Sequence, residues 1–358
     1  MTDIFGININ ATWKQTRDDG ERWLGKRPQG PDGELVEVEV KFNEVNLYDL
    51  DKYVIRPATE EKQCAMVELM ASGDQPPDFF VSHFWAEPIL EFFKCLIEHA
   101  WARGFESKGG HPFALGRSPR YWVCAYANNQ WTLASELVED LAETSFARAM
   151  RISMGTVSVV DSSAGCFGRI WCVYELSYSV SREDKKEFMY DIVTAKGWGS
   201  HGAVAITDGL SAQQEDALAK LQQEKAFPLE LIDKGIAFKC KDGKASVEAD
   251  KVRILKAIGD GSETLDAKVH GVVACAALRR ALEEGGTRRE TFLEAVRNGK
   301  VRKLQLSLMF SDADTAETWR EVVGALDAAA TAAKERMKNR RVLVQVSNTH
   351  LTLPTKAY

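Results

Sequence analysis

Between residues 78 and 206 the chain alternates short apolar runs with longer amphipathic stretches. The runs have the length of strands, and the stretches carry apolar residues three and four positions apart, as helices do. This alternation predicts a parallel β-sheet with helices on both faces. The predicted strands are 78–83, 121–126, 155–160, 188–193 and 203–206, and the predicted helices are 88–102, 132–149, 168–181 and 211–225.

The expected fold is therefore α/β, a flavodoxin-like, doubly wound sheet of five parallel strands. We expect strand 155–160 to lie inside this sheet, parallel to strand 78–83. In open sheets of this kind, ligands bind at the carboxyl ends of the strands. The residues that follow each predicted strand are therefore the first candidates for a functional site.

Composition limits the classes of partner. Of the 358 residues, 45% are hydrophobic, which is ample for a packed core, and the formal net charge is −6. The chain has no long basic run, so neither nucleic acid nor an acidic membrane surface is expected as a partner. It also has no apolar window long enough to span a membrane and no signal-peptide pattern at its start. A cytoplasmic location is expected.

The seven cysteines are odd in number and scattered, with no C-x-x-C pair, which is typical of a reduced intracellular protein. Histidines are few and are not spaced as ligands with one another or with cysteine. No metal site and no bound cofactor is predicted.

The chain outside the sheet divides into further segments. Residues 1–75 are expected to form an N-terminal arm: an irregular, Gly/Pro-punctuated stretch up to residue 33, a half-buried strand over 35–42 and a short helix starting at Thr59. The α/β domain follows over 76–227, with a Gly-rich insert at 104–119.

The C-terminal part is predicted to be mostly helical over 228–300. A strand–helix unit over 301–346, with its strand at 301–308 and its helix at 315–338, resembles one leucine-rich repeat. A lone strand–helix pair is the alternative, because a single repeat cannot bury its own face. The last residues, 347–358, differ in character from the rest and are interpreted as a non-native tail.

The most distinctive motif follows the predicted strand 155–160. Trp171 and Glu175 are four residues apart and so lie on one side of the helix that begins there. Glu175 is either a catalytic carboxylate or a solvent-facing helix residue, in which case its replacement by Gln is expected to change stability little. Trp171 either packs the helix against the sheet or touches a ligand. Arg169 is a candidate phosphate ligand, a partner of Asp161 or a solvated side chain.

Two other loops at the same edge carry candidate binding residues. Ser82, Phe84 and Trp85 follow strand 78–83, and the aromatic rings there either stack on a heteroaromatic base or cap the core. Asn129 follows strand 121–126 and suits either a ribose hydroxyl or the capping of its own loop. The chain has neither a G-x-G-x-x-G after a strand nor a P-loop, so a conventional dinucleotide or P-loop site is not predicted.

The strand Phe79-Phe80-Val81-Ser82 and the later Trp171-x-x-x-Glu175 helix together resemble the Toll/interleukin-receptor (TIR) domain. The resemblance covers about 76–225, with a longer gap between the two motifs than most members have. It implies a signalling protein that associates with itself or with other TIR-like domains. In enzymatic members the Glu of this helix cleaves NAD, so the resemblance implies that Glu175 is catalytic and that NAD is a substrate, not a bound cofactor.

Two functions follow from these observations. In the first, the chain is an NAD glycohydrolase that releases nicotinamide when copies associate. Cleavage of the nicotinamide–ribose bond passes through an oxocarbenium-like state, which one carboxylate can stabilise. In the second, the same edge of the domain is a non-catalytic surface for protein–protein association.

Overall fold

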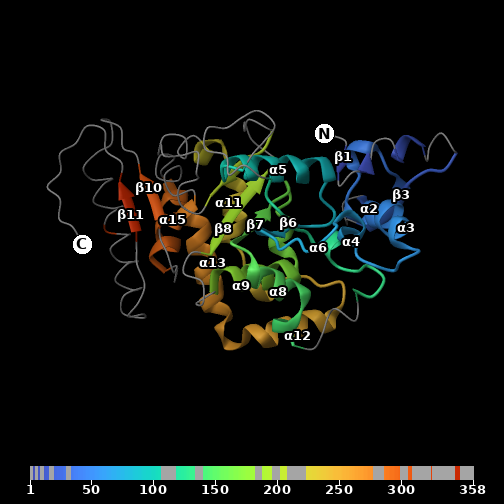
Figure 1. The fold of residues 1–358 in the computed structure, drawn as a ribbon. Helices are drawn as coiled ribbons and strands as arrows, with labels where there is room; N and C mark the ends of the chain where they lie inside the picture. Colours follow the sequence, from blue (N-terminus) through green and yellow to red (C-terminus); the bar gives the residue numbers. More distant parts are fainter. Residues whose placement is uncertain are drawn as a thin grey trace.

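The computed structural model describes most of the chain up to residue 298 and little beyond it (Figure 1). The residues described are 3–4, 7–8, 12–15, 20–29, 34–105, 118–133, 140–181, 188–195, 202–207, 223–276, 286–298, 305–308, 324 and 343–346.

The centre of the molecule is a five-stranded sheet in the order β6-β5-β7-β8-β9. β5 and β7 pair in parallel inside the sheet, as expected, and β6 and β8 extend it in parallel on either side. The predicted α/β class and the mostly parallel sheet are confirmed. The strands are β5 (Phe79–Ser82), β6 (Tyr121–Trp122), β7 (Gly155–Val159), β8 (Met189–Thr194) and β9 (Val204–Ile206).

The prediction that all five strands are parallel is wrong for β9, which pairs antiparallel with β8. The reason is the length of the connection. A parallel crossover takes a dozen or more residues, and the chain between Thr194 and Val204 is shorter than that. β9 therefore returns alongside β8 as the second strand of a hairpin.

β6 is also shorter than predicted. After Trp122 the chain leaves the sheet and forms a helical turn, α6 (Cys124–Ala127). The Gln130 side chain stabilises this turn, because its amide donates to the carbonyl oxygens of Cys124 and Ala125 at 3.0 and 3.2 Å. Of the aromatic and β-branched residues that predict a strand over 121–126, Tyr121 and Trp122 thus lie in the sheet, whereas Val123 and Tyr126 stand outside it.

Helices cover both faces of the sheet (Figure 1). Side chains of alternate parity along the strands enter two separate cores, as the two-residue period of a strand requires. Phe79, Val81 and Val157 pack toward α5, whereas Phe80 and Ile192 pack toward α8 and α9. The bounds are α5 (Ile89–Ala102), η3 (Leu141–Glu143), α8 (Ser145–Ile152), η4 (Gly165–Gly168) and α9 (Ile170–Ser181).

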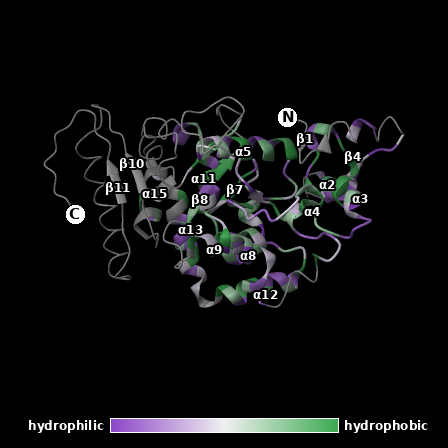
Figure 2. Cartoon of the chain, viewed as in Figure 1, coloured by the Kyte–Doolittle hydropathy of each residue, from purple (hydrophilic) through white to green (hydrophobic). Residues whose placement is uncertain are grey.

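α5 and α9 match their predictions closely, whereas the helix predicted over 132–149 is not continuous. Thr144 is in an extended conformation and caps α8 by accepting from the Ala147 N–H at 3.3 Å. The chain before it forms the separate 3₁₀ turn η3, capped by Asp140. α5 shows both hydrophobic and hydrophilic residues along its length, as an amphipathic helix on a sheet face does (Figure 2).

The N-terminal part is more ordered than an irregular arm. β3 pairs antiparallel with β4 as a separate hairpin, and Trp23, next to β3, is buried and stacks on Tyr53. The expected strand exists as β4, which ends at Glu39; Leu35 and Val36 on it are exposed, whereas Val40 just after it is buried, so only the second half of the predicted range 35–42 is half-buried. The elements are β1 (Asp3–Ile4), β2 (Ile7–Asn8), β3 (Leu24–Gln29), β4 (Glu34–Glu39), η1 (Phe42–Glu44), α2 (Leu47–Leu50) and η2 (Asp51–Ile55).

The short helix expected from Thr59 onward is two helices. α3 (Arg56–Thr59) ends at Thr59, and α4 (Met66–Met70) begins after a break that contains Gln63 at a positive φ of 49°. The Glu68 carboxylate accepts from the Ala65 N–H at 2.8 Å and so fixes the start of α4. Thr59 therefore ends a helix instead of starting one.

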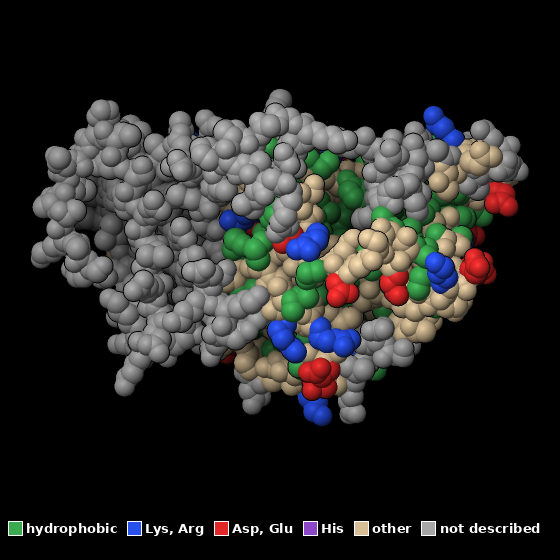
Figure 3. All heavy atoms as spheres, viewed as in Figure 1, with side chains coloured by type: hydrophobic (Ala, Val, Ile, Leu, Met, Phe, Trp, Pro, Cys, Tyr) green, Lys and Arg blue, Asp and Glu red, His purple; other side chains and the backbone are tan. Residues whose placement is uncertain are grey.

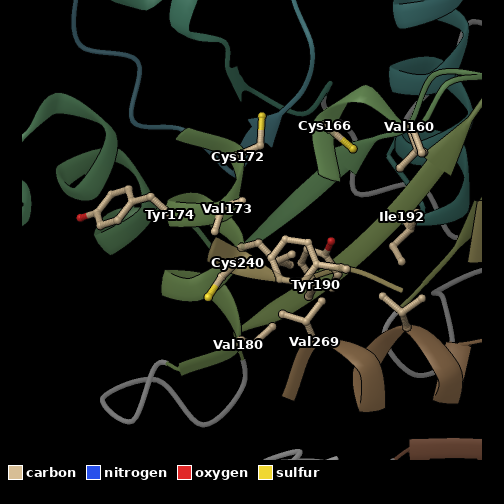
Figure 4. Packing of buried hydrophobic residues seen from close by; sticks show 14 of the residues in the cluster. Val160, Cys166, Cys172, Val173, Tyr174, Val180, Tyr190, Ile192, Cys240 and Val269 are labelled. Carbon is tan, nitrogen blue, oxygen red and sulfur yellow. The ribbon is translucent and has the colours of Figure 1, made fainter. Parts of the chain in front are cut away.

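The segment after the sheet is helical, as predicted, and it shares a core with the sheet. Cys240 and Val269 from this segment pack in the same buried cluster as Val173 and Val180 of α9 (Figure 4). Its elements are α11 (Leu229–Ile236), η5 (Cys240–Asp242), α12 (Glu248–Ile258), η6 (Gly259–Gly261), α13 (Ser262–Ala276) and α15 (Gly286–Asn298).

The strand predicted at 301–308 is present as β10 (Gln305–Leu308) and pairs in parallel with an unpredicted strand, β11 (Leu343–Val346). Most of the predicted helix 315–338, the tail 347–358, most of the insert 104–119 and most of the predicted helix 211–225 lie outside the described residues.

Two surface properties bear on partners. Within the described part of the chain, no helix is both long and apolar enough to cross a membrane. On the described part of the face in Figure 3, basic and acidic side chains are interspersed, with no large patch of one sign.

Candidate functional site

The structure brings Ser82 and Glu175 together. Ser82 is the last residue of β5, and Glu175 lies in the second turn of α9, the helix that follows β7. The Ser82 hydroxyl donates to Glu175 Oε2 at 2.5 Å. β5 and β7 are neighbours in the sheet, and their helices leave toward opposite faces, so the two residues meet where open α/β sheets bind ligands.

Glu175 is neither solvent-facing nor freely exposed. Its side chain is 5% exposed, and burial raises the pKa of its carboxyl group to about 8, although the hydrogen bond from Ser82 acts in the opposite direction. A carboxyl group with such a pKa is mostly protonated at neutral pH. Only a minority of molecules therefore carry the charged form at neutral pH. A raised pKa of this kind is typical of functional carboxyl groups and also of carboxyl groups that are merely buried.

The titratable groups near Glu175 are uncharged at neutral pH. Burial lowers the pKa of His83 to about 3 and raises the pKa of Cys124 to about 12. Burial also raises the pKa of Cys172 well above its ordinary value, and the Glu175 charge adds to this effect. An ionised Glu175 therefore has neutral neighbours in these three residues and would attract a cationic group brought beside it.

The neutral histidine and thiols do not form a nucleophilic pair. The Cys172 thiol donates to the backbone oxygen of His83 at 3.4 Å, not to its ring. His83 Nε2 lies 3.7 Å from Cys124 Sγ, which also accepts from the Trp85 indole N–H at 3.0 Å. Because both thiols have raised pKa values, the thiolate that a cysteine hydrolase needs is disfavoured here.

Phe84 and Arg169 lie beside each other at this edge. The Arg169 guanidinium is 5.6 Å from the centre of the Phe84 ring, and its Nη2 donates to Ser246 Oγ at 3.2 Å. Gly165 approaches the same ring so closely that a Cβ there would meet Phe84 Cδ1 at 2.5 Å. Asp161 accepts from the Gly165 N–H and so shapes this loop. Of the three roles considered for Arg169, an ion pair with Asp161 is not among the contacts of the described residues.

Glu87 is a second buried carboxyl group at the same edge. It is 4% exposed, and burial raises its pKa well above the ordinary value, with Asp161 and Glu91 adding to the effect. Among the described residues, its Oε2 has no hydrogen-bond partner. Its place in the sequence after β5 predicts the edge on which it lies, but its burial could not be read from the sequence.

Trp85 and Trp171 serve mainly as packing residues. Trp85 contacts the Tyr48 ring, 5.3 Å between centres, besides its bond to Cys124. Trp171 stacks on Phe146 of α8 at 5.3 Å, and its indole N–H donates to Asp250 Oδ2 at 3.1 Å. The described partners of Trp171 thus belong to α8 and α12, whereas Glu175, on the same side of α9, bonds Ser82 at the sheet edge.

Asn129 caps its own loop. Its side-chain amide donates to the Gln63 backbone oxygen at 2.6 Å, and its Oδ1 accepts from the Trp131 N–H at 2.9 Å. Both ends of the side chain are therefore engaged by the protein. Of the two roles that the sequence allows for Asn129, these bonds match the capping of the loop.

The long-range contacts of the site could not be read from the sequence. The contacts of Arg169 and Trp171 with Ser246 and Asp250 join positions more than 70 residues apart, and no motif in the sequence links them.

Within the described part of the chain, no group of three or more His, Cys, Asp or Glu side chains is arranged to hold a metal ion.

Comparison of the chain with models of protein families, with curated proteins and with solved structures found no match.

Proposed function

We propose that the chain is a TIR-like signalling protein with a flavodoxin-like sheet, and that it hydrolyses NAD to nicotinamide and ADP-ribose when copies associate. The contact between Ser82 and Glu175 carries this proposal, because it sets a buried carboxyl group at the edge between β5 and β7. The strand order, in which the first strand lies between the second and the third, is the flavodoxin-like order. β9 departs from that pattern by its direction.

The chemistry needs one anionic group beside the reacting ribose. The bond from the ribose carbon to the pyridinium nitrogen breaks, its electron pair stays on that nitrogen, and nicotinamide leaves uncharged. Positive charge develops on the ribose, and water then adds to the same carbon and loses a proton to solvent. Ionised Glu175, flanked by neutral His83, Cys124 and Cys172, would stabilise this charge strongly because the surroundings are poorly polar.

The burial of Glu175 agrees with a site that is closed in the single chain. A substrate reaches a side chain that is 5% exposed only if α9 or the loop after β5 moves. Self-association is the event that we propose to favour the open arrangement, since a partner that binds only the open form shifts the equilibrium toward it.

The test is direct. Purified protein, dilute and concentrated, is incubated with NAD, and free nicotinamide is measured by chromatography. We expect release that grows more steeply than protein concentration and falls by roughly two orders of magnitude in Glu175→Gln, the typical loss for one electrostatic stabiliser. Glu143→Gln is the matched control, because that carboxylate is 61% exposed on η3 and lies outside the site.

The same burial favours a second function. The bond between Ser82 and Glu175 ties α9 to β5 in the way that a purely structural polar contact would. In this alternative the chain is a non-catalytic association module. Concentrated wild-type protein that self-associates but releases no nicotinamide would replace the hydrolase by this module.

A further inference from the structure

We propose that the segment Gly243–Asp250 is a clamp that holds the first turn of α9 against the sheet and so controls access to Glu175. The inference rests on the proposed function of Glu175 for its biological meaning. The effect of the segment on the structure can be measured without NAD: loosening it should open the space between α9 and the sheet.

The backbone of the clamp is bonded to the start of α9. The Ile170 N–H donates to the Lys244 oxygen at 2.9 Å, and the Lys244 N–H donates to the Gly168 oxygen at 2.8 Å. Arg169 and Lys244 accordingly form a parallel β-bridge. The first N–H groups of a helix have no partner within the helix, so the clamp supplies one that water would otherwise provide.

Side chains form the second attachment. Asp250 accepts from the Trp171 indole N–H at 3.1 Å and from Arg253 Nη2 at 3.0 Å. The Arg253 guanidinium in turn lies 5.5 Å from the centre of the Trp171 ring. Ser246 accepts from Arg169 in the middle of the clamp. Three successive residues of the chain, 169–171, are thus bonded to the clamp.

α9 lies between the clamp and the sheet. Ile170 and Val173 face the clamp, because a Cβ placed on Gly243 would meet Ile170 Cδ1 at 3.0 Å and Val173 Cγ2 at 3.2 Å. Cys172 and Val173 project to different sides of the helix (Figure 4). Ser179, one turn beyond Glu175, bonds Thr156 of β7 at 2.7 Å, which places the Glu175 side of α9 on the sheet.

Movement of α9 away from the sheet is one way to give access to Glu175, and the clamp opposes that movement from the outer side. The described groups that interact with the Glu175 carboxyl group come from four elements: Ser82 of β5 by its hydrogen bond, and Cys124 of α6, Cys166 of η4, and Cys172 and Tyr174 of α9 itself by electrostatics. All of them are uncharged at neutral pH. Water entering this space would solvate the carboxylate and lower its pKa.

Two changes act on the clamp in opposite directions. Gly243→Val adds a side chain where the space is already filled and wedges the clamp away from α9. Gly261→Val is the matched control, since nothing lies within 4 Å of a Cβ at that position. Arg169→Cys with Lys244→Cys places two cysteines on bridge partners, whose spacing suits a disulfide that locks the clamp.

The first measurement does not involve NAD. Alkylation of Cys172 by iodoacetamide under native conditions is followed by mass spectrometry. This thiol belongs to α9, is buried and interacts with Glu175, so its labelling reports the opening of the space between α9 and the sheet. We expect Gly243→Val to be labelled roughly tenfold faster than Gly261→Val and wild type. The locked protein should be labelled more slowly than the same protein after reduction. Equal rates in the locked and reduced forms overturn the clamp, even if Gly243→Val fails to fold.

The second measurement is the pH dependence of nicotinamide release. Gly243→Val should move the rising limb of the profile to lower pH by lowering the pKa of Glu175, whereas a merely destabilised protein would lose rate without moving the limb. Faster labelling with no nicotinamide from any variant leaves the clamp standing and removes the hydrolase. Nicotinamide release with unchanged labelling and an unchanged profile removes the clamp and leaves the hydrolase.

Discussion

Two buried carboxyl groups lie on opposite faces of the same sheet and are treated in opposite ways. Asp191 of β8, on the α5 side, pairs with Arg103 through two hydrogen bonds and lies 2.8 Å from His99 Nε2. Glu175, on the α9 side, has the Ser82 hydroxyl as its described partner. Burial alone disfavours the charge of Asp191, but the charge and hydrogen bonds of Arg103 and His99 lower its pKa below the ordinary range.

The difference separates a structural carboxylate from a candidate functional one. Asp191 is charged and neutralised in place, and His99 extends its network to the Tyr121 hydroxyl at 2.7 Å. Among the described residues no cation contacts Glu175, so its raised pKa keeps it protonated and its ionisation works against the closed fold. The ionised form of Asp191 therefore stabilises the folded sheet on the α5 side. Ionisation of Glu175 destabilises the closed arrangement on the α9 side and favours its opening.

The largest effect is expected from Arg103→Ala. This change leaves the Asp191 charge buried without its cation, which typically costs about 3–5 kcal/mol of unfolding free energy. Denaturant unfolding at pH 7 measures it. Arg22→Ala is the control, since its pair with Glu39 is 67% exposed on the arginine side and should contribute at most about 1 kcal/mol. Similar losses in the two variants would mean that Asp191 does not depend on Arg103.

The next effect concerns the pH dependence of Glu175→Gln. Because the folded pKa of Glu175 is raised, ionisation destabilises the wild type as pH rises from the unfolded pKa toward about 8. The variant lacks this loss, so between pH 5 and pH 8 it should gain on the wild type by on the order of 3 kcal/mol, at about 1.4 kcal/mol per pKa unit. Unfolding curves at the two pH values measure the gain, and Glu143→Gln should show none.

Asp191 should give the opposite dependence. Its depressed pKa contributes stability that is present above the unfolded pKa and lost as pH falls through the folded value. The combined contribution of these two carboxyl groups should therefore be largest at mildly acidic pH, near their unfolded pKa values, and smaller at pH 8. A difference between wild type and Asp191→Asn that does not shrink as pH falls would contradict the assignment of opposite roles to the two carboxyl groups.

The smallest effect is expected from Ser82→Ala. Removing the donor to Glu175 should cost about 1–2 kcal/mol at pH 8, where the carboxylate needs the bond, and less at pH 5. Because the Ser82 bond lowers the pKa of Glu175, the rising limb of any NAD cleavage should move to higher pH. Ser163→Ala is the control for loss of a surface bond, because its exposed hydroxyl, in the loop after β7, donates to Asp161. An unmoved limb would separate Ser82 from the chemistry.

Part of this arrangement could be predicted from the sequence. Strong periodic segments gave β5, β7, α5 and α9, and parallel pairing of β5 with β7 follows from a long crossover. Those elements suffice to bring Ser82 and Glu175 to one edge. The direction of β9 was predicted wrongly because an apolar run does not show in which direction a strand runs. The short connection from Thr194 could have indicated an antiparallel strand.

The environment of each candidate could not be predicted. Whether Glu175 faces water or the sheet depends on the rotation of α9, which packing against Ile170 and Val173 decides. From the helix pattern alone, Glu175→Gln was expected to change stability little. Because this side chain is only 5% exposed, the expected change in stability now depends on pH. β3 was missed for a local reason, since Gly25 and Pro28 within it are typical of turns.

The core that α9 shares with the C-terminal helices decides how far the sheet can be used as a portable module. Val173 and Val180 are covered by residues such as Cys240 and Val269, which come from beyond residue 227. A shortened chain that stops at the end of the sheet would expose these apolar residues of α9 to solvent and would tend to aggregate or to bind other molecules non-specifically. Grafting the sheet onto another protein, or using it alone as bait for partners, therefore calls for carrying α11, α12 and α13 along with it.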